Sequence, residues 1–293
     1  MTAEVIHTTV FHDGERGGNP CPVVLDAHHL TEEEMMDFSA HFGQETAFVL
    51  PAEHGDHDWR FRFFMPSKEV GMCIHGTIGA LTVLLNREDT VAPTVKIETG
   101  VGVVDVDWTK KEDGYTVRVE QYKPVIADTN PSYEEVCRAL QINKSDLAAD
   151  LPLQSVSTSR QKLLVPLKRE GILESLQPDF KYMWELCDRY QTSGFYPFTF
   201  RADGEVQARQ FPNRAGYLED PATGVAACAL GAYLSMQDGR DTEAPEWKTY
   251  LIHQGREMGR PSVMQAEVYR SSKGVLRTFV RGKAKLETEW KAL

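Results

Sequence analysis

Two short segments of the chain combine groups that can bind an anion with groups that can transfer a proton. Residues 73–77 read Cys-Ile-His-Gly-Thr, and residues 219–224 read Glu-Asp-Pro-Ala-Thr-Gly. Each segment precedes an apolar stretch that predicts a helix, and the free backbone N–H groups at a helix start attract anions. Asp220 suits the N-cap of the second helix, and Pro221 suits its first helical position. If the two helix starts face each other, they can clamp one small carboxylate.

Glu45 is a third candidate, because it stands directly before a predicted strand at residues 46–50. A reaction that removes a proton from carbon and returns it elsewhere needs one group that acts as base and then as acid. Buried carboxyl groups can take both forms near neutral pH, and Phe48 and Phe64 are candidates for burying this one. By itself the residue type is weak evidence, since charged side chains at strand ends are usually solvated.

The helices that follow the two segments have almost no polar face. They cover residues 78–85 and 225–234. A helix that is apolar on all sides must be enclosed, and a strongly curved antiparallel sheet can enclose it. Strand candidates surround both helices, at residues 5–10, 46–50, 59–64, 95–99, 101–108, 115–119, 163–167, 194–201, 206–211, 263–269 and 275–280. A parallel doubly wound sheet would instead require amphipathic helices, so it fits this pattern poorly.

The chain has 293 residues, which exceeds the usual size of one hydrophobic core. Both halves follow one order: a strand ending in Phe and Pro, a polar segment with glycine, an apolar helix and further strands. We therefore predict an α+β protein with two similar domains, residues 1–122 and 123–293. The sequence leaves open whether the last strand, near residues 275–285, packs on the second domain or returns to the first. Capping boxes at Thr31/Glu34 and Ser132/Glu135 predict two further helices.

Composition excludes several classes of function. The formal net charge is -11 and no block of Lys and Arg is present, which argues against nucleic acid as a partner. The five cysteines are widely spaced without a CxxC pair, which favours a reducing compartment over a disulfide framework or a zinc site. The first residues lack a basic and apolar export signal, and no apolar run reaches membrane-spanning length. We expect a cytoplasmic protein without a membrane segment.

The order of these motifs resembles the PhzF family of phenazine-biosynthesis proteins over essentially the whole chain. The matching segments are residues 18–20 (GNP), 45–48 (ETAF), 64–66 (FMP) with 69–70 (EV), Cys73, His75, 219–224, 254–255 (QG) and 258–262 (MGRPS). The resemblance implies a diaminopimelate epimerase-like fold. In that fold, two similar domains each form a curved, mostly antiparallel, barrel-like sheet around a central buried helix. It also implies an active site between the domains, and often a homodimer.

The resemblance implies a role for each residue that matches a family position. By position, Glu45 would carry the proton, with His75 and Asp220 beside it, and neither metal nor organic cofactor would be needed. Substrate contacts would come from Asn19, Cys73, Ile74, Gly76, Thr223, Gly224 and Val225. Simpler structural roles exist for three of these residues. His75 and Asp220 can serve as helix caps, and Asn19 as a turn residue.

Related epimerases and proline racemases use two thiols, one at each helix start. Residues 220–224 contain no cysteine, and Cys228 lies inside the second apolar helix, where a thiol packs as a small hydrophobe. We therefore do not expect a two-thiol racemase, and we expect Cys73 to be at most a wall of the pocket.

Three positions depart from the usual family pattern. Ile74 replaces a glycine, Gln44 replaces a small hydroxyl residue, and Val225 replaces a polar residue. An isoleucine at position 74 either narrows the pocket or changes the local turn. We therefore expect an isomerase, of the double-bond-shift or epimerisation type, acting on a small anionic metabolite other than the phenazine precursor. The alternative is a binding or regulatory protein that kept the crevice but lost turnover.

Overall fold

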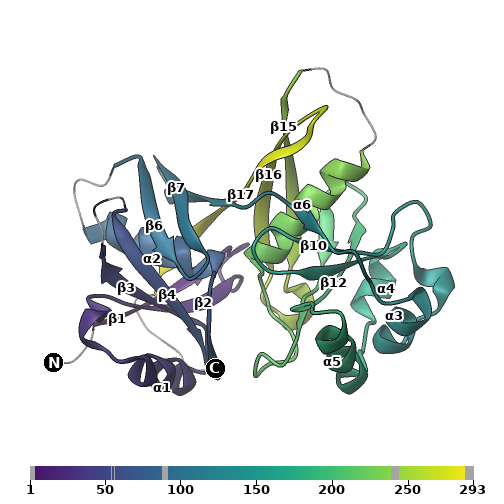
Figure 1. The fold of residues 1–293 in the computed structure, drawn as a ribbon, viewed down its shortest axis with the longest axis horizontal. Coiled ribbons are helices and arrows are strands. Elements are labelled where there is room, and N and C mark those ends of the chain that lie inside the picture. Colours follow the sequence, from purple (N-terminus) through teal and green to yellow (C-terminus); the bar gives the residue numbers. More distant parts are fainter. Residues whose placement is uncertain (1–3, 54, 56, 88–91, 239–243, 288–293) are drawn as a thin grey trace.

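The computed structural model describes residues 4–53, 55, 57–87, 92–238 and 244–287. Two long apolar helices, α2 (Ile74–Arg87) and α6 (Gly224–Gln237), lie in different lobes of the molecule (Figure 1). Residues 74–85 of α2 and 224–235 of α6 are all buried. The prediction that both helices are enclosed is therefore confirmed, and it is the sheet that encloses them.

The first lobe wraps a mostly antiparallel sheet around α2. Two neighbouring strand pairs, β2–β3 and β4–β6, are parallel. Helix α1 (Glu32–Phe42) packs outside this sheet, against β3 and β4. The strands are β1 (Val5–Val10), β2 (Asn19–Val24), β3 (Thr46–Pro51), β4 (Trp59–Met65), β5 (Lys68–Val70), β6 (Thr94–Thr99), β7 (Gly102–Lys111) and β8 (Gly114–Gln121).

The second lobe wraps its strands around α6 and carries three shorter helices on the outside (Figure 1). The helices are α3 (Tyr133–Leu140), α4 (Glu170–Glu174) and α5 (Phe180–Arg189). The strands are β9 (Val125–Ile126), β10 (Gln154–Ser157), β11 (Lys162–Pro166), β12 (Gly194–Phe200), β13 (Val206–Ala208), β14 (Phe211–Pro212), β15 (Glu246–Gln254), β16 (Ser262–Ser271) and β17 (Gly274–Leu286). Single 3₁₀ turns lie at Ala27–His29, Lys144–Asp146 and Arg256–Met258.

The last strand joins the two lobes. One part of β17 pairs with β16 of the second lobe, where Gln265 lies opposite Arg281. The same strand pairs with β8, where Thr278 lies opposite Gln121, and its end pairs with β1. The sequence left open which domain the last strand joins. In the structure, β17 pairs with strands of both lobes.

The capping boxes predicted two helix starts correctly, whereas the starts of α2 and α6 were predicted wrongly. Helix α2 begins at Ile74, so residues 74–77 lie within the helix instead of before it. The capping boxes at Thr31 and Ser132 are both formed. Asp220, however, is not the N-cap of α6, because the helix begins at Gly224 and Thr223 occupies the cap position. The Asp220 backbone instead forms a β-bridge with Gln210, which holds residues 220–223 outside the helix.

Candidate active site

The starts of α2 and α6 meet between the lobes. A Cβ atom added to Gly224 would lie 2.8 Å from Cβ of Ile74, so the two helix ends are in direct contact. Glycine at position 224 permits this approach, because any side chain there would displace Ile74. The expectation that these two N-termini share one crevice is therefore met by the geometry.

Three side chains with acid–base or nucleophilic chemistry gather at the start of α2. The ligand atoms of Glu45, Cys73 and His75 all lie within 4.8 Å of one another. Nε2 of His75 lies 3.8 Å from Oε2 of Glu45, and its Nδ1 lies 3.3 Å from Sγ of Cys73. The backbone N–H of Gly76 donates to Sγ of Cys73 at 3.1 Å, which fixes the thiol at the helix start.

Glu45 is buried, and its carboxylate is only partly satisfied. The residue is 9% exposed, and Oε1 has no hydrogen-bond donor within the described part of the chain. The buried Oε1 of the neighbouring Gln44 also has no hydrogen-bond donor among the described residues. Buried acceptors are normally paired, so these two oxygens identify a place where a ligand donor or water would bind.

The Cys73 thiol is held in its protonated form. Burial raises its pKa well above the usual range, and the nearby Glu45 carboxylate adds to the effect. Burial and Glu45 also raise the pKa of Cys21, which is fully buried on β2. Because the thiolate is the nucleophilic form, neither cysteine is poised as a base at neutral pH.

On the α6 side, Asp220 is the centre of a hydrogen-bond network. Nδ2 of Asn19 donates to Oδ1 of Asp220 at 2.7 Å, and the Thr223 hydroxyl donates to Oδ2. Nε2 of Gln254 donates to the backbone oxygen of Asp220 at 2.5 Å, while Oε1 of Gln254 accepts from Tyr196 at 2.9 Å. Burial raises the pKa of Asp220, and nearby His75 opposes that rise.

Gly255 of the 254–255 motif and Gly17, directly before the 18–20 motif, allow backbone segments to meet around this network. A Cβ on Gly255 would lie 2.3 Å from the backbone oxygen of Arg260 and 2.6 Å from that of Pro221. A Cβ on Gly17 would lie 1.8 Å from the oxygen of Pro261, which also accepts from the Gly18 N–H at 3.2 Å. These close backbone contacts fix the positions of the turns that carry Asn19 and Asp220.

The site has two connected chambers, which share Glu45, His75, Tyr217 and Asp220. The outer chamber has a volume of about 210 Å³, and the inner chamber about 30 Å³. The outer chamber is also lined by Asn19, Pro20, Gly43, Gln44, Glu219, Pro221, Met258 and Arg260. The inner chamber is also lined by Met65, Met72, Cys73, Ile74, Arg160, Lys162, Gln210, Pro212, Thr223, Gly224 and Val225.

Nine of the ten expected site residues line these chambers, and Gly76 lies behind them. A Cβ on Gly76 would lie 2.9 Å from the Phe63 ring and 3.0 Å from Sγ of Cys73, so the residue faces the core. The sequence reasoning missed Lys162, Arg160, Gln210 and Tyr217. One signal was available, namely a lysine that opens the otherwise apolar strand at residues 162–166.

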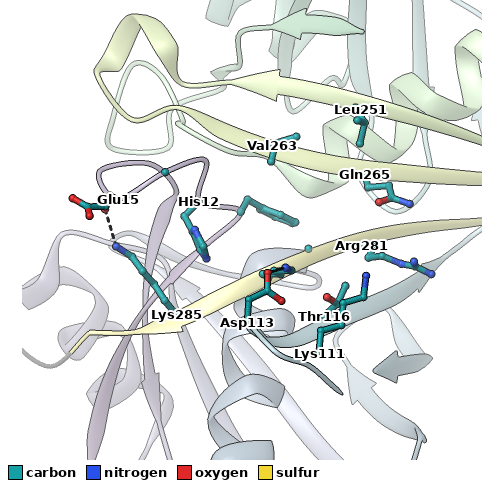
Figure 2. Close-up of a pocket in the computed structure, with 14 residues that line it drawn as sticks. His12, Glu15, Lys111, Asp113, Thr116, Leu251, Val263, Gln265, Arg281 and Lys285 are labelled. Carbon is teal, nitrogen blue, oxygen red and sulfur yellow. Dashed lines mark hydrogen bonds and ion pairs between the residues drawn. The ribbon is translucent and has the colours of Figure 1, made fainter. Parts of the chain in front are cut away.

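A larger cavity of about 690 Å³ lies elsewhere, between β15–β17, the β7–β8 hairpin and the loop after β1 (Figure 2). Its lining includes none of the residues of the two chambers. Three of the cationic side chains that line it have partners: Lys285 donates to the backbone oxygen of Glu15, Lys283 pairs with Asp113, and Arg281 pairs with Glu267. The fourth, Lys111, is exposed to solvent. This cavity has volume but lacks the acid–base groups of the smaller site.

A metal ion would find three ligands at the inner site, in Glu45, Cys73 and His75. The donor set fits poorly, however, because the thiol is buried in its protonated form and would have to lose that proton. Coordination would also occupy the Glu45 carboxylate.

The two sheet-enclosed helices whose starts meet between the lobes define an α+β protein with its candidate site between two similar halves. The chain belongs to the PhzC-PhzF family, described as phenazine biosynthesis-like protein, whose model matches residues 8–289. An uncharacterized isomerase of Clostridium acetobutylicum is 31% identical over 257 residues, covering 86% of this chain and 85% of the relative.

Solved structures agree with this assignment. A PhzF-family phenazine biosynthesis protein of Bacillus anthracis is 28% identical, with a TM-score of 0.88 and 100% coverage of both chains. A hydroxyproline epimerase of Agrobacterium vitis, solved with trans-4-hydroxy-L-proline, has a TM-score of 0.66 at 12% identity, covering 97% of this chain and 90% of its own. The fold is therefore diaminopimelate epimerase-like, and the chain is an isomerase. Within the described residues, no helix is long and apolar enough to cross a membrane.

Proposed function

We propose that this isomerase moves a proton on a small carboxylate-bearing metabolite, with Glu45 as the acid–base group and without a cofactor. The observation that carries the proposal is the position of Glu45: buried, with one free carboxylate oxygen, where the two chambers join beside both helix starts. A carboxylate there can reach a substrate that spans both chambers.

The proposed reaction follows from these positions. Glu45 removes a proton from a substrate carbon, and the electron pair of the broken C–H bond moves into the adjacent carboxylate or conjugated system. Backbone N–H groups at the helix starts and the polar groups of His75 and Asp220 stabilise the charge that develops there. Protonated Glu45 exchanges its proton with solvent and then delivers a proton to another carbon, which completes a double-bond shift with no net gain or loss of atoms.

Assigning both proton transfers to Glu45 favours the double-bond shift over epimerisation. Inversion at one carbon requires removal of a proton from one face and delivery to the other, so it needs a second acid across the substrate. The paired thiols of related racemases do not supply it here, because the segment before α6 lacks cysteine and Cys228 is fully buried within that helix. We further propose a homodimer from the family resemblance, which sedimentation or light scattering can test.

The test is exchange of substrate protons with heavy water. We expect the protein to incorporate deuterium into at least one member of a panel of small 2-amino, 2-hydroxy and 2,3-unsaturated acids, as read by NMR. Glu45→Gln should abolish the incorporation and still bind the same acid, whereas Glu185→Gln, on an exposed face of α5, should behave like the unaltered protein. Incorporation that survives Glu45→Gln would refute the role of Glu45.

The second candidate is a binding protein without turnover. The contact between Ile74 and Gly224 favours it, because an isoleucine fills space that a family glycine would leave open between the helix starts. Such a protein would bind acids from the panel but incorporate no deuterium into any of them, and Glu45→Gln would then change binding alone.

A further inference from the structure

The side chains of a buried lysine and a buried glutamine line the inner chamber and have no hydrogen-bond partner among the described residues. Lys162 is 2% exposed and Gln210 is 1% exposed. Neither the Oε1 nor the Nε2 atom of Gln210 has a hydrogen-bond partner in the described part of the chain. Among the same residues, the ammonium group of Lys162 makes no hydrogen bond and no ion pair. Buried polar groups in this condition are rare and costly in a folded protein.

The fold directs Lys162 toward the chamber. Side chains alternate along β11, so Lys162 and Leu164 share a face, and Leu164 belongs to the core that contains α6. An apolar residue at this position would pack better than a lysine. Arg160, two residues earlier, lines the same chamber, and its guanidinium likewise has no ion pair among the described residues.

We propose that Lys162 and Gln210, with Arg160 beside them, form the subsite that binds the carboxylate of the substrate and thereby determine specificity for an acid. The inference rests on the proposed function and refines it. The inner chamber, at about 30 Å³, holds one carboxylate group, while the outer chamber of about 210 Å³ holds the rest of the metabolite. The carbon next to the bound carboxylate then lies at the junction, beside Glu45 and His75.

The charge of the subsite depends on pH. Burial and, to a smaller extent, Arg160 lower the pKa of Lys162 to about 7, although Asp220, Cys187 and Glu45 oppose the fall. A carboxylate bound beside the lysine favours the ammonium form. Above pH 7, binding of a carboxylate should therefore be coupled to protonation of Lys162. The affinity for an acid should fall as the pH rises from 7 to 9.

The test compares crotonate with crotonamide, its neutral analogue, by titration calorimetry and NMR. We expect the unaltered protein to bind crotonate at least about tenfold more tightly than crotonamide, because a charge-assisted hydrogen bond is involved. Lys162→Met should remove that preference, Lys162→Arg should retain part of it, and Lys168→Met, which alters an exposed lysine just after the same strand, should leave it unchanged. Gln210→Leu should weaken crotonate binding independently.

Two outcomes would overturn the proposal: equal binding of both probes by the unaltered protein, or an undiminished preference for crotonate in a folded Lys162→Met protein. Repeating the titration with Glu45→Gln separates this proposal from the proposed reaction. A Lys162-dependent preference in that variant supports the subsite even if no proton exchange is ever detected. Loss of exchange in Glu45→Gln supports the reaction even if Lys162 proves irrelevant to binding.

Discussion

Ile74 at the start of α2 packs directly against Gly224 at the start of α6, where an added Cβ would lie 2.8 Å from Cβ of the isoleucine. The contact explains how the structure accommodates an isoleucine at position 74, where the family pattern has a glycine. The isoleucine takes up the space between the helices without forcing them apart, because residue 224 has no side chain. Ile74 lines the inner chamber, and α2 begins at that residue.

We predict that Gly224→Ala destabilises the protein by about 1–3 kcal/mol, the usual cost of overpacking a core. The added methyl group would meet Ile74 at 2.8 Å and the Phe11 ring at 3.2 Å, and neither is free to move. Urea unfolding measures the change. Gly171→Ala, where the nearest atom is the end of the Arg169 side chain at 3.8 Å, should cost little. Combining Gly224→Ala with Ile74→Gly should cost less than the sum of the two changes, and strict additivity would contradict direct contact.

We also predict that Lys162→Met raises the free energy of unfolding near neutral pH. The folded state lowers the pKa of Lys162 from its ordinary 10.5 to about 7, so between these values the unfolded chain binds more protons. Stability due to this residue therefore rises with pH across that window and is lowest at pH 7 and below. The full difference corresponds to at most about 5 kcal/mol, at about 1.4 kcal/mol per pH unit.

Urea unfolding of both proteins at pH 6.5 and 9.5 measures this linkage. The advantage of Lys162→Met should be largest at pH 6.5 and should shrink at pH 9.5, while Lys168→Met should differ from the unaltered protein equally at both. A variant that is less stable at pH 6.5 would mean that Lys162 has a structural partner. The predicted result is typical of a group kept for function at the expense of stability.

The sequence predicted the elements that depend on neighbouring residues. The apolar runs of α2 and α6 and the capping boxes at Thr31 and Ser132 are local patterns, and all four are present in the structure. Helix α5 and strand β15 went unrecognised, although α5 carries a local signal: its buried residues Met183, Leu186 and Cys187 recur at helical spacing, and Asp179 caps its start. The domain division at residues 122 and 123 stays a prediction, because β17 joins both lobes through one sheet.

The missed site residues depend on contacts that are distant in sequence. Lys162 reaches the chamber because β11 pairs in parallel with β12, with Leu163 opposite Phe195. Asp220 was wrongly predicted to cap α6, because Asn19, 201 residues away, binds its carboxylate. No local pattern carries either relationship, whereas the family resemblance supplied Glu45, His75 and Asp220 by position.

We predict that proton exchange does not require a metal ion. Glu45, Cys73 and His75 lie close enough to coordinate one, but burial keeps the thiol protonated. Dialysis against EDTA should therefore leave deuterium incorporation unchanged within about twofold. The metal content of the purified protein, measured by mass spectrometry, provides the control. Activity that falls after dialysis and returns on adding a single divalent ion would replace the acid–base proposal with a metal site.

Asn19→Asp provides a test of how Asp220 is held. In the structure the amide of Asn19 donates to Oδ1 of Asp220 at 2.7 Å and to the backbone oxygen of Ala222 at 2.8 Å. Replacing the amide with a carboxylate puts two acids at hydrogen-bond distance in a buried site, so ionisation of the second one is disfavoured. We expect the pKa of Asp220, already raised by burial, to rise further and the pair to titrate as a unit.

Exchange by Asn19→Asp should then be reduced about 10- to 100-fold at pH 8 and should recover toward the level of the unaltered protein as the pH falls to 5.5, where the shared proton is bound. Asn19→Ala, which removes the donor without adding charge, should lose activity without this recovery. If both variants show the same pH profile, Asn19 acts only as a turn residue, and the bond to Asp220 has no part in positioning that carboxylate.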